Sequence, residues 1–293
     1  MSATTERLGP HRSRILEFLG RASRHGLIVT GAVIIGTLGL VAIFGDRLAP
    51  FDPELMDFTV PLAPPSLTHL FGTDEFGRDV FSRVLHGARV SFQVAFIAVA
   101  ISATMGVLLG SLAGFFGRWL DELIMRVMDV LFAFPAVLLA ITVMAILGRG
   151  VENAMIAIAI VYVPIFARVT RGAVIAVRGL EYINAARALG QSSLLIIWRH
   201  VLPNATGPII VQTSLSLAFA ILAEAALSFF GLGTQPPDPS WGRMLAEGRA
   251  FMAQAPWMGV FPGVAIMLSV MGFNFLGDGL RDLLDPRLKN VLR

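Results

Sequence analysis

The sequence has no cysteine and only one lysine among its 293 residues. Without cysteine, the chain has no disulfide bonds, no thiol catalysis and no thiolate metal site. The single lysine, Lys289, is followed by Asn290. A Walker A loop needs Gly-Lys-Ser/Thr to hold nucleotide phosphates, so the chain carries no site of that kind.

Groupings of side chains typical of enzymes are also missing. The five histidines are scattered through the sequence, with no metal-ligand spacing. No Gly-x-Ser-x-Gly elbow occurs, and no carboxylate pair falls within an apolar run. The sequence therefore predicts no catalytic residue and no metal site.

Charge is scarce and unevenly distributed. Only 15% of residues are charged and 55% are hydrophobic, whereas about a quarter of residues are charged in a soluble domain. The mean hydropathy is +0.73. A transmembrane helix needs about 20 apolar residues. The uncharged runs cover residues 25–45, 90–117, 130–148, 153–167, 205–223 and 250–277.

These runs predict an all-α membrane protein with six transmembrane helices. The fourth run is short and contains Pro164, so its helix must extend past Arg168, through residues 172–177. Residues 118–129 are expected to form a short charged loop at the cytoplasmic surface. Pro135 stands where the first turn of the third span tolerates proline.

Basic residues predict the orientation. With the N-terminus inside, 16 of the 23 lysines and arginines fall on the cytoplasmic side, as expected for a multi-pass protein of the cytoplasmic membrane. Both termini and residues 178–204 are then cytoplasmic. The net charge of +3 thus reflects topology rather than nucleic-acid binding.

The N-terminal region predicts a retained anchor. Residues 1–24 form a basic tail expected to lie near anionic lipid. The run at 25–45 is followed by Asp46-Arg47-Leu48 instead of a small-residue cleavage site. We therefore interpret it as the first transmembrane helix, followed by an outer segment at 46–89.

A polar interruption at residues 181–204 predicts two short helices joined by a glycine. Residues 181–189 favour a helix, which Gly190 can end in the left-handed conformation. Ser192 or Ser193 can cap a second helix. Pro203 is expected to stop that helix. Its predicted apolar face consists of Leu194, Leu195, Ile197 and Trp198.

This interruption resembles the EAA loop of ABC-importer permeases, which docks onto the ATPase. Asn184 stands where an acidic residue is usual, and His200 where isoleucine is usual. The ATPase-coupling residues implied by the resemblance are Glu181, Asn184, Ala185, Ala186, Gly190, Leu202 and Pro203. The alternative is an ordinary amphipathic connector on the lipid surface. Residues 178–204 are called the coupling loop below.

A second motif lies in the outer segment. Two glycines there allow tight turns, and the carboxylates and the arginine can lock the loop by charge pairing. A ligand contact is the alternative. The motif residues are Gly72, Thr73, Asp74, Gly77, Arg78 and Asp79. With the Ser-Arg-Val that follows, the string resembles the C-type permease subunit of the dipeptide/oligopeptide/nickel importer subfamily.

Two features inside the spans have two interpretations each. Gly106, Gly110 and Gly114 form a small-xxx-small repeat that favours close helix packing, or else bending in a gate. Glu224 is the one ionisable residue well inside an apolar stretch. It either lines the transport pathway near an outer gate or makes an interhelical hydrogen bond. The segment 231–255 would then form the outer mouth.

The resemblance covers essentially the whole chain and implies a type I ABC-importer permease fold. Residues 90–285 would be the permease domain, and residues 286–293 a cytoplasmic tail. The implied partners are two ABC ATPases, a second and different permease chain, and a substrate-binding receptor. This chain would bind no cofactor, because the ATPases use ATP and magnesium.

The resemblance does not identify the substrate. A dipeptide or oligopeptide is our first expectation, with nickel, glutathione or another small solute as alternatives. A different class, a secondary transporter coupled to protons through Glu224, predicts transport that needs no ATPase.

Overall fold

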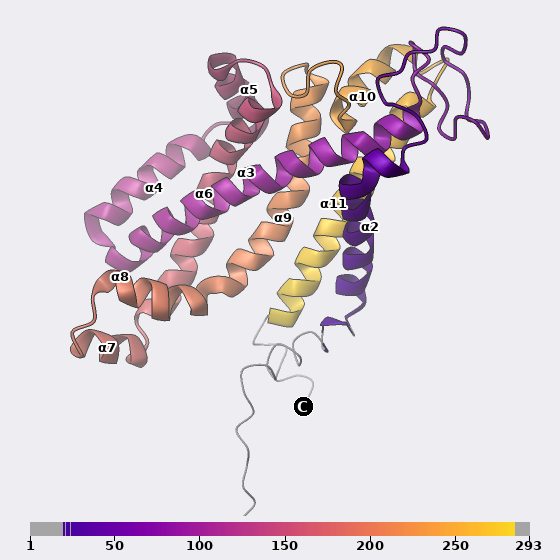
Figure 1. Ribbon diagram of the computed structural model, residues 1–293. Coiled ribbons are helices and arrows are strands. Elements are labelled where there is room, and N and C mark those ends of the chain that lie inside the picture. Colours follow the sequence, from indigo (N-terminus) through magenta and orange to yellow (C-terminus); the bar gives the residue numbers. More distant parts are fainter. Residues whose placement is uncertain (1–19, 21, 24, 285–293) are drawn as a thin grey trace, which may run out of the picture.

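The computed structural model describes residue 20, residues 22–23 and residues 25–284. The described chain is a bundle of helices (Figure 1), and its only β-type pairing is an isolated bridge between Thr73 and Asp79. The two predicted tails, 1–24 and 286–293, fall mainly or wholly outside the described residues, as does Lys289.

Five helices are long and apolar enough to cross a membrane, and the spans number six if one bent pair of helices counts as a span. The bent pair is α4 (Arg118–Phe132) with α5 (Ala136–Leu147), which meet at 93°. The five single helices are α2 (Gly26–Leu48), α3 (Val80–Phe116), α6 (Val151–Arg178), α9 (Leu202–Phe229) and α11 (Trp257–Leu284). As predicted, the fourth span, α6, extends past Arg168.

Two predicted boundaries need correction. Helix α3 begins at Val80, ten residues before the predicted start of the second span, because the carboxylate of Asp79 accepts a hydrogen bond from the Ser82 N–H and caps the helix. The charged stretch predicted as a loop at 118–129 is the helix α4. Its charges belong to an amphipathic helix, with Asp121 and Asp129 paired to arginines of α6.

The α3–α6 contact is built on the glycine repeat. A β-carbon at Gly110 would collide with the backbone carbonyl oxygen of Ala167, and one at Gly114 would come within 2.9 Å of the Arg171 carbonyl oxygen. Glycine therefore allows the two helix backbones to approach closely. Of the two interpretations of the repeat, the structure supports packing.

The bundle has two distinct ends (Figure 1). The short helices α7 (Glu181–Ala188) and α8 (Ser193–Ile196) lie at one end, which we call the α7 end. Residues 49–79 and α10 (Trp241–Gly248) lie at the other, which we call the loop end. The start of α2 and the end of α11 are at the α7 end, where His25 and Asp282 lie 3.7 Å apart.

Candidate functional site

The coupling loop contains the glycine-terminated helix expected from the sequence. Gly190 has a φ of +77°. Its N–H donates to the Arg187 carbonyl, and the next N–H, from Gln191, donates to the Ala186 carbonyl. These two backbone hydrogen bonds form the Schellman motif, in which a residue in the left-handed conformation ends a helix. Helix α7 therefore ends because of Gly190.

Helix α7 is anchored to the bundle by a narrow apolar face. Ile183 and Ala186 are buried, and they join an apolar cluster with the ends of α3 and α6 and the start of α9. The guanidinium of Arg187 lies 5.0 Å from the ring centroid of Phe115 in α3. The cluster contains Phe115, Val174, Val177, Ile183, Ala186, Ile196, Ile197, Val201, Leu202 and Ala205.

The predicted coupling residues divide between the two faces of this loop. Ala186 and Leu202 are buried and hold the loop to the spans. The other five are exposed: Glu181, Asn184, Ala185, Gly190 and Pro203. The loop thus combines an anchored face with a free face, as a docking element requires.

The second short helix differs from the prediction. Leu194, Leu195 and Trp198 are exposed, and the buried face consists of Ile196, Ile197 and Val201. Ser192 is the N-cap residue, but its side chain makes no capping hydrogen bond. Of the four predicted residues, Ile197 is buried as expected, and it begins a π-helical turn, η1 (Ile197–Val201), which carries one residue more than an α-helical turn.

Pro203 does not stop the helix, contrary to the prediction. Helices α8 and α9 are continuous through η1, and Pro203 lies in the first turn of α9. The Leu202 N–H bonds to the Ile197 carbonyl five residues earlier. Pro203 has no N–H to donate to the Arg199 carbonyl, and the wider π-helical turn before it accommodates that loss.

At the loop end, the six residues of the outer motif form one structure. Gly72 and Gly77 both have positive φ, near +73° and +74°. One carboxylate oxygen of Asp74 accepts from the N–H groups of Phe76 and Arg78, and the other accepts from the Arg78 Nε at 2.6 Å. The geometry matches the self-satisfied loop rather than a ligand contact.

Thr73 and Asp79 extend this structure to its neighbours. The buried hydroxyl of Thr73 donates to the Val60 carbonyl and accepts from the Ala63 N–H. Asp79 lies 2.9 Å from His69 Nδ1 through one oxygen and caps α3 through the other. Residues 57–79 are therefore held to the start of α3 by buried hydrogen bonds.

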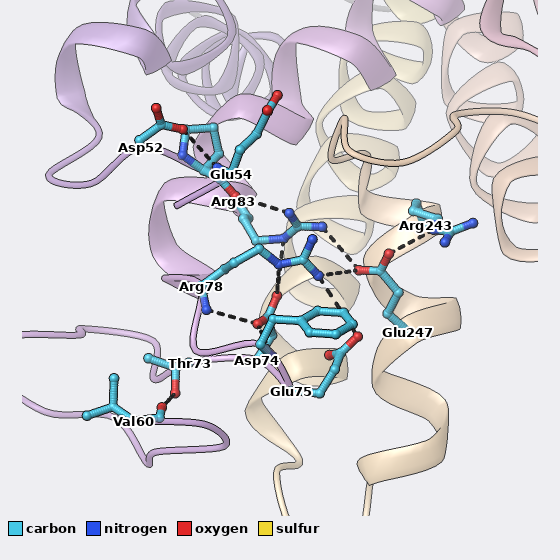
Figure 2. Close-up of polar contacts among 12 residues, drawn as sticks. Asp52, Glu54, Val60, Thr73, Asp74, Glu75, Arg78, Arg83, Arg243 and Glu247 are labelled. Atoms are coloured by element: carbon cyan, nitrogen blue, oxygen red, sulfur yellow. Dashed lines mark hydrogen bonds and ion pairs between the residues drawn. The ribbon is translucent and has the colours of Figure 1, made fainter. Parts of the chain in front are cut away.

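The side chains that join this loop to α10 could not be predicted from the sequence. Figure 2 shows Arg78 and Arg83 converging on Glu247 of α10, at 3.6 and 3.1 Å from its Oε2. Arg83 also donates to the Pro53 carbonyl, and Arg243 holds the other oxygen of Glu247 at 2.8 Å. Because 164 residues separate Arg83 from Glu247, no local pattern reports their pairing.

We call this group the outer charge cluster: Asp74, Glu75, Arg78, Arg83, Arg243 and Glu247 (Figure 2). Three carboxylates face three guanidinium groups, so the cluster is formally neutral. Burial, together with the nearby carboxylates of Asp74 and Glu247, raises the pKa of Glu75. Its Oε2 is buried and has no hydrogen-bond partner among the described residues.

Glu224 is fully enclosed within the chain, with 1% of its surface exposed. Its two carboxylate oxygens accept hydrogen bonds from Ser91 of α3, at 2.9 Å, and from Ser228 one turn further along α9, at 2.7 Å. This geometry is that of an interhelical hydrogen bond. A role in the transport pathway remains a prediction.

Two apolar grooves follow the face shared by α9 and α11. One has a volume of about 440 Å³ near Phe229 and Val260, and the other about 480 Å³ near Leu222 and Asn274. Both include Met267, which is more than half exposed. They form an uncovered apolar surface between two spans.

Comparisons with known proteins agree with this architecture. Residues 106–290 match the family described as binding-protein-dependent transport system inner membrane component. Residues 13–65 match the N-terminal TM domain of oligopeptide transport permease C.

Two curated relatives have different names at nearly the same identity. The chain is 49% identical over 274 residues to the dipeptide transport system permease protein DppC of Alkalihalophilus pseudofirmus, covering 94% of this chain and 90% of that protein. It is 48% identical over 274 residues to the glutathione transport system permease protein GsiD of Escherichia coli O6:K15:H31, covering 93% and 90%.

A solved structure shows the same fold at much lower identity. It is an inward-facing conformation of the MetNI methionine ABC transporter, with a TM-score of 0.58 and 18% identity, covering 69% of this chain and 96% of that one. The predicted fold, an all-α membrane protein of the type I importer permease class, is thereby confirmed.

Proposed function

The chain belongs to the family of binding-protein-dependent transport system inner membrane components, and we propose that it is half of a peptide-importing pore worked by separate ATPases. It is a C-type permease subunit of an ABC importer, and as such a transport component rather than an enzyme. ATPase and substrate-binding partners follow from that class. The peptide substrate, the paired permease chain and the membrane orientation are parts of the proposal.

One observation carries the mechanism: the coupling loop is exposed on one face and packed on the other. Asn184 and Ala185 are free to meet a partner, whereas Ile183 and Ala186 are buried against the ends of α3, α6 and α9. A push on the free face therefore reaches three spans through apolar contact. Nucleotide-driven closure of two ATPases, with one coupling loop on each, would shift the spans from inward-open to outward-open.

The proposed orientation places the α7 end in the cytoplasm and the loop end outside. The count of basic residues favours this orientation. The position of α7 at the same end as the start of α2 and the end of α11 agrees with it. The loop end, with residues 49–79 and α10, would then receive substrate from the receptor. The ATPases, not this chain, would bind ATP and magnesium.

A second permease chain is needed because six spans make half a pore. The grooves between α9 and α11 offer it an apolar surface, with Val260 and Met267 exposed. In this subfamily the second chain is typically a different one, so we propose a heterodimer. No second, identical copy is then required.

We propose a dipeptide or oligopeptide as the substrate. The support is the 49% identity to a dipeptide permease, and the 48% identity to a glutathione permease fits a small peptide equally well. Uptake of labelled dipeptide, glutathione and nickel by the complete complex, with its own receptor, decides among them. Uptake of nickel but of neither peptide would contradict this part of the proposal.

The test of the mechanism is purification of the chain with its natural neighbours, followed by ATP-driven uptake in proteoliposomes. We expect two ATPase subunits and a second permease to copurify. Gly190→Pro should abolish ATPase docking and uptake while leaving membrane insertion intact, because proline cannot adopt a φ of +77°. Gly179→Ala is the control, since Gly179 has a φ of −90°. Proton-driven uptake without any ATPase would overturn the proposal in favour of a secondary transporter.

A further inference from the structure

Gln191 connects two parts of the coupling loop. Its backbone N–H closes α7 by donating to the Ala186 carbonyl. Its side-chain Oε1 lies 2.9 Å from Nε2 of His200, in the π-helical turn before α9. With the Nε2 proton present, the imidazole donates and the amide oxygen accepts. One residue thus joins the end of α7 to the start of the following span.

The position of His200 is set by the residues after it. Pro203 has no N–H to donate, so the Arg199 carbonyl lacks its usual helical partner. The chain widens into η1, and the Asn204 side-chain amide donates to the His200 carbonyl at 2.7 Å. The Leu202-Pro203-Asn204 sequence thereby produces the turn that presents His200 to Gln191.

No other side-chain hydrogen bond joins residues 181–191 to residues 193–229 in the part of the chain that the structure describes. The remaining attachment of α7 to the bundle is the apolar packing of Ile183 and Ala186, together with the Arg187 guanidinium over the Phe115 ring of α3. Apolar contact resists separation but is non-directional, whereas a hydrogen bond constrains direction. The Gln191–His200 bond therefore supplies what the apolar cluster lacks, a fixed angle.

We infer that Gln191 and His200 are a positioning pair that holds α7 at a set angle to α9, so that displacement of α7 by an ATPase moves α9 with it. The inference rests on the proposed function of the coupling loop. Without the pair, α7 stays docked to its ATPase, but it turns against the apolar cluster before α9 moves. ATP is then hydrolysed with less transport.

The test measures transported solute per ATP hydrolysed by the complete complex in proteoliposomes. Gln191→Leu and His200→Leu should each lower this ratio about fivefold, the change in population that corresponds to one hydrogen bond of about 1 kcal/mol. ATPase copurification should be unchanged in both variants. The double variant should be no worse than either single one, because both remove the same bond.

A double variant in which the two residues are exchanged distinguishes a positioning role from a general effect on stability. In the double variant Gln191→His with His200→Gln, the amide and the imidazole can bond again in the opposite order, so the ratio should recover. Ser192→Ala is the matched control, because the Ser192 side chain makes no capping bond, and it should behave like the unsubstituted chain.

Unchanged ratios in the single variants would overturn the inference, and so would additive losses without rescue by the swap. If the unsubstituted complex shows ATP-driven uptake while the variants are unaffected, only this inference fails. If the unsubstituted complex shows no ATP-driven uptake, the proposed function fails and the inference fails with it.

Discussion

The loop end holds itself together with buried charge, whereas helix α7 is held by a small apolar face, the Arg187–Phe115 contact and one side-chain hydrogen bond to the π-helical turn before α9. At the loop end, Arg83 is 2% exposed and pairs with Glu247, while Arg78 pairs with Asp74. At the α7 end, Ile183 and Ala186 carry the packing. Buried charge networks break at high cost and specify a single arrangement. The comparison indicates a rigid loop end and, at the α7 end, an element that can be displaced.

The largest effect is expected from Arg83→Ala at the loop end. The variant leaves Glu247 without one of its guanidinium partners, and removing one member of a buried pair costs about 3–5 kcal/mol. Thermal unfolding in detergent measures the loss. The control is Arg126→Ala, whose pairing to Glu122 joins side chains 74% and 77% exposed and which should cost at most about 1 kcal/mol. Equal losses would remove the contrast between buried and exposed charge.

Ile183→Ala breaks the apolar anchor of the α7 end. Truncating a buried isoleucine costs about 2–5 kcal/mol, and here the loss should stay local to the coupling loop. Hydrogen exchange should therefore speed up in residues 181–201 and remain unchanged at residues 57–79. Leu189→Ala, at a side chain 81% exposed, is the matched control. Faster exchange at both ends would show that they are not independent.

Gly190→Ala tests the turn that aims α7. An L-residue in the left-handed conformation costs about 1–2 kcal/mol, although a β-carbon at Gly190 has open space around it. The cost should appear as increased protease sensitivity of the coupling loop. Gly179→Ala, at a negative φ, should cost nothing measurable. Identical behaviour of the two variants would exclude backbone strain as the cause.

The smallest effect is expected from Glu75→Gln, which should raise the melting temperature at high pH only. Because burial raises its pKa, the folded state favours the protonated form. The contribution of Glu75 to stability is therefore present at pH below its unfolded pKa and is lost as the pH rises through the folded pKa. Glu75→Gln should raise the melting temperature at pH 8 by about 2 °C and make no difference near pH 4. A gain at pH 4 that vanishes at pH 8 would contradict this sign.

Local patterns predicted one short structure at each end, the glycine-terminated helix α7 and the self-satisfied loop around Asp74. Helix propensity over residues 181–189, followed by a glycine, predicts that Gly190 adopts the left-handed conformation, and its φ is positive in the structure. The six spans follow from hydropathy, although the 93° bend between α4 and α5 does not. The break lies at residues 133–135, where Pro135 immediately precedes α5, and proline marks a possible kink without setting its angle.

The outer charge cluster could not be predicted from the sequence because its partners lie far apart along the chain. Glu247 gives no sign of its partners, because Arg83 lies 164 residues away. The π-helical turn at 197–201 was missed for a different reason. An extra residue in one turn leaves helix propensity unchanged, so no local pattern reports it; of the predicted apolar face, Ile197 is buried and Leu194, Leu195 and Trp198 are exposed.

The central claim is that the free face of α7 lies in the cytoplasm and receives an ATPase. Because the chain has no cysteine, Asn184→Cys would carry the only thiol of this subunit. We predict that a membrane-impermeant maleimide labels this thiol in inside-out vesicles but not in intact cells, and that bound ATPase subunits protect it. Labelling from the outside of intact cells, or labelling unaffected by the ATPases, would contradict the account.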